Sequence, residues 1–218
     1  AVNYLYLKHR LVTSPIGGPL QVLRSFSRLP ARLRHPELGL LSQENRMMEN
    51  RLRLLLSETS NCVDVGAHIG SMSYLFHRLS PKGQHHIVEP SPSKATWLRR
   101  RFPGATLHQK AVSDTAGEVS FYENIDQPGF SSLTDREGRG KTQQITVGCA
   151  LLDDLLAEMP KVDLIKIDVE GHEYNALKGA RKILERHRPV ILFEAGATTD
   201  KDIDNKAYVA LFDLLTGP

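Results

Sequence analysis

The feature that most restricts the fold is a regular alternation of short apolar runs with stretches of helical spacing, from residue 61 onward. The apolar runs are rich in Val, Ile and Leu and end in polar or glycine-containing turns, at 61–66, 85–90, 105–112, 162–171 and 188–196. Helical spacing occurs between them, at Met72, Leu75, Phe76 and Leu79 and again at Leu177, Ala180 and Leu184. Such alternation is typical of a mostly parallel sheet covered by helices on both faces. The sequence therefore predicts an α/β fold.

Composition places the chain among ordinary globular proteins. Of its 218 residues, 40% are hydrophobic and 24% are charged, which excludes disordered, collagen-like and repeat-built chains. No apolar run approaches the roughly 18 residues that a membrane helix needs, so we expect no transmembrane segment. Cys62 and Cys149 lack the spacing of metal ligands or of a secreted disulfide scaffold, which predicts a reducing, cytoplasmic location. Residues 1–18 do not resemble a signal peptide, and we expect further chain before Ala1 because the sequence lacks an initiator methionine.

The N-terminal part of the chain differs from the rest in charge. Residues 1–60 hold 9 Lys and Arg against 4 Asp and Glu, whereas the whole chain holds 28 against 25. The absence of clustered aromatic residues favours a helical arm with a solvated basic face over a surface that grips nucleic acid or lipid. Residues 42–58 carry the clearest helical stripe. We predict a basic helical arm over residues 1–59 and a main domain over residues 60–218.

Residues 113–150 interrupt the alternation and are expected to form an insertion or lid. Residues 117–124 and 142–148 predict a strand pair, and the loop 126–141 between them is rich in Gly, Ser and Arg. Closure of this loop would exclude water from a site beneath it. Its candidate contacts are Phe130, Ser131, Ser132, Arg136 and Arg139, of which the arginines would either grip an acidic ligand or remain solvated.

The turn after the first predicted strand is the first candidate for ligand binding. It reads Asp64-Val65-Gly66-Ala67-His68-Ile69-Gly70. Open parallel sheets bind ligands at the carboxyl ends of their strands, and Gly66 and Gly70 would let a ligand approach the backbone. The N-terminus of the next helix would point its free amides at that ligand. The spacing differs from the G-x-G-x-x-G of dinucleotide enzymes, so a dehydrogenase is disfavoured, and a glycine turn without a ligand is the alternative.

The ends of the next two strands supply further candidates. Glu89 follows the second strand, where a carboxylate accepts hydrogen bonds from both hydroxyls of a ribose; the alternative is a solvated acid. Val112 follows the third strand and would pack against an adenine ring, while Asp114 would accept from its amino group or simply form a turn. The chain lacks G-x-x-x-x-G-K-[ST], and Asp64 would repel a pyrophosphate. A nucleoside that carries a positive charge fits better.

These segments together resemble a known family. DVGAHIG, IVEPSP, AVSD-x-x-G, SSL, LDDL, LIKIDVEGHE-x-x-x-LKGA and RPVILFEAG occur in the order of the FkbM-type family of S-adenosylmethionine-dependent methyltransferases, over about residues 60–196. The resemblance implies a Rossmann-like class I methyltransferase fold, S-adenosylmethionine as cofactor, and transfer of methyl to a hydroxyl of a small molecule or sugar. It places Asp64, Gly66 and Gly70 on the cofactor loop, Glu89 at the ribose and Asp114 near the adenine.

The chain departs from the family pattern at two places. His68 stands where the family most often has Asn; His tolerates a positive φ, so the turn survives, and its side chain is also a candidate contact for the methionine moiety. Such folds end in an antiparallel strand pair, whereas residues 206–215 predict a helix, with Tyr208, Leu211, Phe212 and Leu215 on one face. The closing hairpin is therefore expected to be missing, because the chain is truncated or because a partner supplies the strands.

Catalytic residues are expected at the end of the fourth strand. Methyl transfer depends chiefly on holding the acceptor oxygen, methyl carbon and sulfur in line, aided by a base for the hydroxyl proton. Asp168 is the first choice for contact beside the methyl group, with Glu170 and His172 as alternative bases. If the strand continues, Asp168 and Glu170 share one face of it. Glu170 and Glu173 would otherwise cap the next helix, and Glu194 has an open role.

Other interpretations remain open. No metal is expected, because the acids and His172 lack a recognisable ligand spacing. The remaining histidines, on several predicted elements, are expected to be packing or surface residues. A nucleoside-binding scaffold without activity is one alternative function, and a nucleic-acid methyltransferase that uses the N-terminal arm is another. The expected partner is a small-molecule or sugar acceptor, without a strong signal for nucleic acid, and a homo-oligomer is compatible with the sequence.

Overall fold

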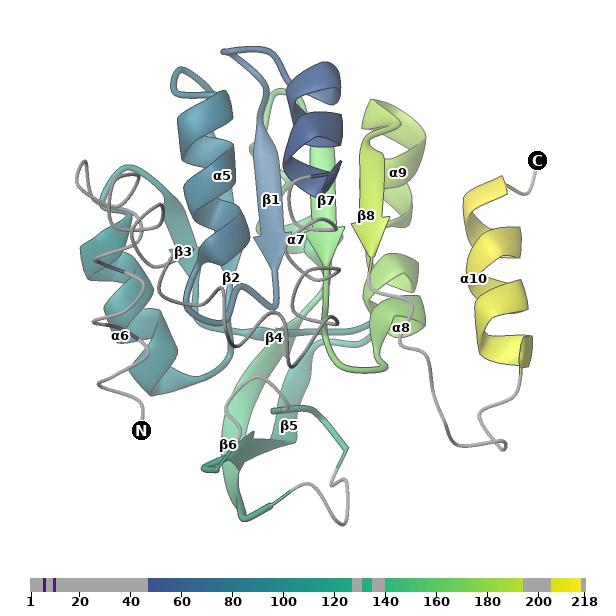
Figure 1. Ribbon diagram of the computed structural model, residues 1–218. Coiled ribbons are helices and arrows are strands. Elements are labelled where there is room, and N and C mark those ends of the chain that lie inside the picture. The colour runs from purple at the N-terminus through teal and green to yellow at the C-terminus, as the bar shows by residue number, and fades with distance from the viewer. Residues whose placement is uncertain are drawn as a thin grey trace, which may run out of the picture.

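A parallel sheet forms the centre of the protein (Figure 1). The computed structural model describes residues 6, 10, 47–126, 131–134, 140–193 and 205–216, of which 205–208 are described by their backbone alone. Five parallel strands lie in the order β3-β2-β1-β7-β8. Their bounds are β1 (Cys62–Val65), β2 (His85–Val88), β3 (Thr106–His108), β7 (Leu164–Ile167) and β8 (Val190–Phe193). The chain thus extends the sheet from β1 in one direction and then from β7 in the other, as in Rossmann-like folds.

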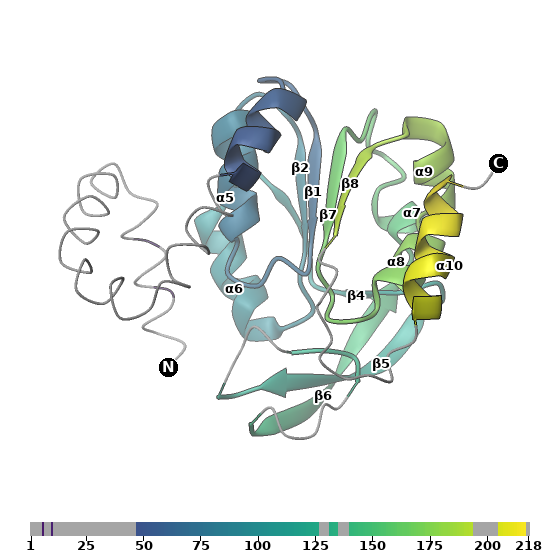
Figure 2. The ribbon, with the colours of Figure 1, turned by 45° about the vertical axis from the view of Figure 1, so that its right-hand side comes forward.

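Helices cover both faces of this sheet (Figure 2). On one face lie α5 (Ser71–Leu79), α6 (Pro92–Arg101) and the helical residues 47–55. On the other face lie α7 (Leu152–Leu155), α8 (Glu173–Lys178), α9 (Arg181–His187) and α10 (Asn205–Thr216). The predicted α/β fold is confirmed. In the part of the chain that the structure describes, no helix combines the length and apolarity that crossing a bilayer requires.

The side chains of β1 alternate between the two layers. Val63 and Val65 are fully buried against α7, α8 and α9, whereas Cys62 packs in a cluster with Leu52 and Phe76 on the opposite face. Successive strand residues point to opposite faces, so Asp64 shares the face of Cys62 and points toward α5. This alternation decides where the carboxylate of Asp64 lies in the site described below.

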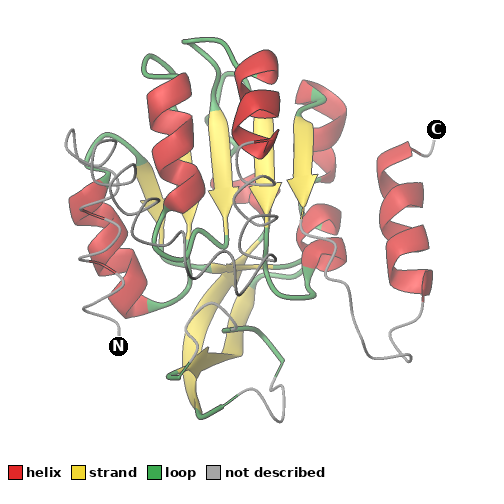
Figure 3. Ribbon diagram, viewed as in Figure 1, coloured by secondary structure: helices red, strands yellow, loops and turns green. Residues whose placement is uncertain are grey.

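A second, smaller sheet extends beyond the carboxyl edge of the first (Figure 3). It contains β4 (Ala111–Val112), β5 (Gly117–Asn124) and β6 (Thr142–Ala150) in the order β4-β6-β5, with β5 and β6 antiparallel. The predicted strand pair in the insertion is therefore confirmed. The prediction of a single strand over 105–112 is wrong. The exposed residues 109 and 110 separate β3, which pairs with β2, from β4, which pairs with β6.

The helical region 173–187 is also divided. The Gly179 carbonyl accepts from the Asp153 N–H at 2.9 Å, and the Asp153 carboxylate accepts from Lys182 and Ile183 N–H at 3.1 and 2.9 Å. These bonds end α8 and cap a new helix, α9. Farther along, the predicted C-terminal helix forms as α10, and Leu211 is buried at 3% exposure whereas Phe212 is 54% exposed.

Four of the remaining histidines lie in two pairs. The rings of His77 and His85 lie 4.5 Å apart between centroids, and His86 and His108 are joined by an Nδ1 to Nε2 hydrogen bond of 3.0 Å. Burial lowers the pKa of all four, that of His86 to about 4. They are therefore neutral packing residues at neutral pH, which agrees with the role predicted for them.

Candidate active site

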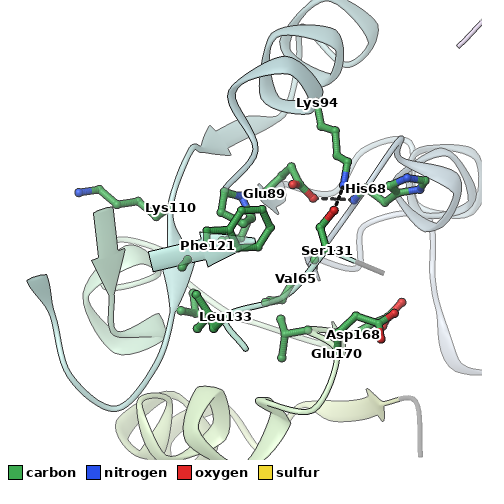
Figure 4. Close-up of a pocket in the computed structure, with 16 residues that line it drawn as sticks. Val65, His68, Glu89, Lys94, Lys110, Phe121, Ser131, Leu133, Asp168 and Glu170 are labelled. Carbon is green, nitrogen blue, oxygen red and sulfur yellow. Dashed lines mark hydrogen bonds between the residues drawn. The ribbon is translucent and has the colours of Figure 1, made fainter. Parts of the chain in front are cut away.

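A pocket opens where the carboxyl ends of β1, β2 and β7 meet (Figure 4). The direction in which the sheet grows reverses between β1 and β7, and open α/β sheets bind ligands at such a point. The second sheet supplies the opposite wall. Six of the site residues predicted at the strand ends line the pocket, together with Ser131 of the predicted insertion; the six are Gly66, His68, Glu89, Val112, Asp168 and Glu170.

Gly66 and His68, in the loop that follows β1, line the pocket. Gly66, His68 and Gly70 all have positive φ, at 70°, 54° and 86°, so the expectation that His68 accommodates the turn is confirmed. A Cβ on Gly66 would lie 1.8 Å from the Asp168 carbonyl oxygen, so only glycine fits between β1 and the end of β7. The Gly66 and Ala67 N–H groups both donate to the Val88 carbonyl, at 3.0 and 3.2 Å. The loop is thereby tied to the end of β2.

Glu89 joins this loop to the second strand. Its side chain is buried, at 3% exposure, with Oε2 accepting from the His68 N–H at 2.8 Å and Oε1 accepting from the Ser91 N–H at 3.0 Å. Burial raises the pKa of Glu89, while the Lys94 ammonium and these two N–H donors act in the opposite direction. A carboxylate oxygen accepts more than one hydrogen bond, so both oxygens keep capacity for ligand hydroxyls.

The end of β7 supplies two more acids to the pocket. Asp168 directly follows the strand, and the next acid, Glu170, has a left-handed φ of 55°. The strand does not continue to residue 170, as one prediction required. Instead the turn at Glu170 brings its side chain to the pocket by a change of backbone direction rather than by strand alternation.

The pocket lies within a region of the chain that matches a known family. The family model of the methyltransferase FkbM domain matches residues 64–213, which contain the whole pocket lining. This chain belongs to the FkbM methyltransferase family.

Several named proteins are similar to this FkbM-family chain. It is 29% identical over 159 residues to the hexuronic acid methyltransferase AglP of Haloferax volcanii, covering 70% of this chain and 64% of AglP. It is 28% identical over 148 residues to Methyltransferase 1 of Beauveria bassiana, with 56% and 59% covered. It is 27% identical over 181 residues to the 2-O-methyltransferase NoeI of Sinorhizobium fredii, with 73% and 74% covered. The chain thus spans less than two thirds of the first two of these relatives.

Solved structures also match. An FkbM methyltransferase from Methylobacillus flagellatus matches at 22% identity and a TM-score of 0.48, over 64% of this chain and 34% of that one. A precorrin-6y C5,15-methyltransferase from Geobacter metallireducens matches at 18% identity and the same TM-score, over 79% and 71%.

In this FkbM-family chain, the prediction that Asp64 contacts the ligand is wrong, because Asp64 does not line the pocket. Strand alternation turns its side chain toward α5, where Oδ2 accepts from the Ser73 N–H at 2.8 Å and from the Ser73 hydroxyl at 2.5 Å. Its Oδ1 lies 3.4 Å from the Lys166 ammonium. Asp64 is 1% exposed, so its carboxylate acts on the pocket only through these partners.

Lys166 is a central residue that sequence reasoning missed. Its Nζ donates to the Gly66 and Val65 carbonyls at 2.9 and 3.3 Å, and lies 3.5 Å from the Asp168 carboxylate. Burial opposes its charge, but Asp64 and Asp168 outweigh burial and raise the pKa of Lys166. The signal was present in LIKIDVEG: a lysine two residues before Asp168 shares its strand face.

Four other predicted residues lie away from the pocket lining. Ala67 is buried against Leu98 and Phe102, and a Cβ on Gly70 would lie 2.4 Å from the Phe102 ring, so both pack α5 against α6. The Asp114 carboxylate accepts hydrogen bonds from the Lys178 ammonium and the Ser113 hydroxyl, and Lys178 lowers the pKa of Asp114. His172 is the N-cap residue of α8. The adenine role of Asp114 and the base role of His172 therefore have no support from the pocket geometry.

Several predicted positions fall outside the described residues, namely Phe130, Arg136, Arg139 and Glu194.

Glu173 stabilises the loop between β7 and α8, because its Oε1 accepts hydrogen bonds from the Val169 and Gly171 N–H groups at 3.2 and 3.1 Å. Among the residues that the structure describes, no three His, Cys, Asp or Glu side chains gather in a way that would hold a metal ion.

The pocket also contains Phe121 and Lys94, which were not predicted, and Ser131, which was predicted as a contact of the insertion. Val112, Phe121 and Leu133 are apolar residues of the pocket lining. Ser131 and Lys94 lie beside Glu89 (Figure 4). The space between these residues is about 690 Å³, a volume that includes open solvent at its mouth. A buried carboxylate for a ribose and apolar side chains for a flat ring fit an adenosyl methyl donor.

Proposed function

We propose that the protein is an S-adenosylmethionine-dependent O-methyltransferase that acts on a hydroxyl of a sugar or a small metabolite. The observation that carries the proposal is the 2.8 Å hydrogen bond from the His68 N–H to Glu89 Oε2. This bond joins the glycine loop of β1 to the acid at the end of β2. A ligand bound there contacts both at once, as an adenosyl group requires.

The ribose and adenine of the donor would bind at the β2 side of the pocket. Glu89 would accept hydrogen bonds from the ribose hydroxyls, each worth about 1.5–3 kcal/mol for a charged acceptor. Val112, Phe121 and Leu133 would pack on the adenine. When bound, the donor supplies an electrophilic methyl group on a sulfonium.

The acids at the end of β7 would face the methyl end. The ammonium of Lys166 is shared between Asp64 and Asp168, so Lys166 would hold the charge of Asp168 beside the methyl group of a bound donor. This fixed charge favours a cationic donor and orients the acceptor hydroxyl. Asp168 and Glu170 both line the pocket, so either carboxylate is a candidate to take the proton from that hydroxyl.

The names of the relatives support the acceptor class. One relative is a hexuronic acid methyltransferase and another is a 2-O-methyltransferase. Transfer to oxygen needs no oxyanion hole, so positioning of the two reactants accounts for most of the catalysis. A sugar or metabolite hydroxyl is therefore the acceptor we propose.

Titration calorimetry tests the donor assignment. We expect the protein to bind S-adenosylhomocysteine, and to bind neither NAD nor ATP under the same conditions. Glu89 suits a ribose diol, whereas the pocket offers no G-x-G-x-x-G loop and no phosphate-binding lysine motif. Binding of NAD or ATP in preference to S-adenosylhomocysteine would refute the proposal.

Asp168→Asn tests the methyl end of the site. We expect kcat with an identified acceptor to fall about tenfold, or about 1.4 kcal/mol, while the affinity for S-adenosylhomocysteine changes less, because the product lacks the sulfonium charge. Asp154→Asn on the exposed face of α7 is the matched control. An unchanged kcat, or an equal loss in product affinity, would assign the role of Asp168 to another residue.

A further inference from the structure

Lys94 is a buried cation that the proposed chemistry does not use. It lies in the first turn of α6, which Ser91 caps through its hydroxyl and Pro92 begins. Lys94 is only 7% exposed and lines the pocket beside Glu89. A buried ammonium is costly unless it is paired, so its partners indicate what it does there.

One partner belongs to the insertion. The Lys94 Nζ donates to the Ser131 hydroxyl at 3.4 Å, and Figure 4 shows the lysine reaching from α6 toward that serine. The same hydroxyl accepts from the Asn124 N–H at 3.1 Å, at the end of β5. The Ser131 hydroxyl thus lies between α6 and the second sheet.

The segment 131–134 is fixed to β5 on its other side. Ser132 and Tyr122 exchange two backbone hydrogen bonds, of 2.9 and 3.2 Å, in an antiparallel bridge. Alternation along this short extended piece leaves Ser131 and Leu133 on the pocket side, and both line it, whereas Ser132 is buried away from it. The segment is therefore a wall of the pocket, attached to β5 by its backbone and to α6 through Lys94.

We propose that Lys94 is a donor-positioning residue, which holds the segment 131–134 against α6 so that the ribose end of the pocket is covered beside Glu89. This inference rests on the proposed function, and it implies that the insertion takes part in binding the methyl donor. Covering the ribose removes competing water, which strengthens the hydrogen bonds to a buried carboxylate. Loss of the Lys94 contact would therefore weaken donor binding even though Lys94 does not belong to the glycine loop or to the acids.

Lys94 has a second effect through its charge. The charged and titratable groups that act on Glu89 are Lys94 of α6, Lys166 of β7 and the half-buried Tyr6, together with the N–H groups of His68 and Ser91. Lys94 and Lys166 both favour the ionised form of Glu89, which accepts the ribose hydroxyls. Without Lys94 the pKa of Glu89 rises further, so donor affinity should begin to fall at a higher pH as the solution is acidified.

The experiment is calorimetric titration of S-adenosylhomocysteine into the wild type, Lys94→Met, Ser131→Ala and the double variant. We expect each single variant to weaken binding about tenfold, as for loss of one hydrogen bond with a charged donor. The double variant should lose less than the product of the single effects, because both remove the same contact. Lys182→Met, at an exposed position of the α9 helix, is the matched control and should bind as the wild type does.

The outcomes separate this inference from the proposed function. A wild type that binds S-adenosylhomocysteine, with unchanged affinity in Lys94→Met and in Ser131→Ala, overturns the role of Lys94 alone. A wild type that does not bind it overturns the proposed function as well. If Lys94→Met fails to fold, Ser131→Ala decides by the same criterion. In Lys94→Met, the fall of affinity on acidification should begin at a higher pH than in the wild type and in Ser131→Ala, which a purely structural role would not produce.

Discussion

Lys166→Met is expected to lower the free energy of unfolding by about 3–5 kcal/mol, the cost of removing one partner from a buried ion pair. The Lys166 side chain is 11% exposed and lies 3.4 Å from Asp64, which is itself 1% exposed. Methionine fills the same space but leaves that carboxylate buried without its cation. It also removes the donor to the Gly66 carbonyl, so the glycine loop loses one of its bonds to β7.

Urea denaturation of the wild type and variants measures this effect. Lys82→Met, which removes a surface pair with Glu58 at 68% exposure of both side chains, is the control and should cost no more than about 1 kcal/mol. Asp64→Asn should cost less in the Lys166→Met background than in the wild type, because it removes the uncompensated charge. Equal costs in both backgrounds would contradict the coupling.

The stability that the Lys166–Asp64 pair contributes depends on pH in a definite direction. The pKa of Lys166 is raised above 10.5 in the folded protein by Asp64 and Asp168. A base with a raised folded pKa contributes stability that is complete below its unfolded pKa and is lost as the pH rises through the folded value. The contribution of Lys166 is therefore constant across the neutral range and disappears only in strong alkali, whereas Lys166→Met lacks it at every pH.

The main sheet could be predicted because its strands are signalled locally. β1, β2, β7 and β8 are short apolar runs between polar turns, and burial on both faces requires that pattern. The split between β3 and β4 could not be predicted, because it depends on the pairing of Ala111 and Val112 with the distant β6. Likewise α8 and α9 are separated by bonds from Asp153, which lies in α7. Long-range pairing decides both cases.

In the candidate site, too, some residues could be predicted from local patterns, whereas others depend on long-range packing. Glu89 and the glycine loop could be predicted, because topology alone brings the carboxyl ends of neighbouring parallel strands together. The direction of Asp64 depends on which face of β1 packs on α5, and its pairing with Lys166 depends on the register of β1 and β7. Lys94 and Phe121 come from elements whose approach to the pocket no local pattern specifies, whereas Ser131 belongs to the predicted contacts of the insertion.

Glu89→Gln is expected to weaken binding of S-adenosylhomocysteine about a hundredfold, or about 2.7 kcal/mol. The amide removes the charge that the ribose hydroxyls would meet. It also introduces a conflict, because both carboxylate oxygens accept backbone N–H groups, from His68 and from Ser91. The NH₂ of glutamine must face one of these donors, so the glycine loop or the start of α6 is displaced from the pocket.

A ligand analogue separates the ribose contact from this displacement. Removing the 3′-hydroxyl of S-adenosylhomocysteine should weaken binding to the wild type by roughly tenfold or more, and should weaken binding to Glu89→Gln much less, because the charged acceptor is already gone. Glu118→Gln, at an exposed position of β5, should behave as the wild type with both ligands. If the 3′-deoxy analogue loses the same affinity in the wild type and in Glu89→Gln, the ribose does not bind at Glu89. The donor would then have to lie elsewhere along the carboxyl edge of the sheet.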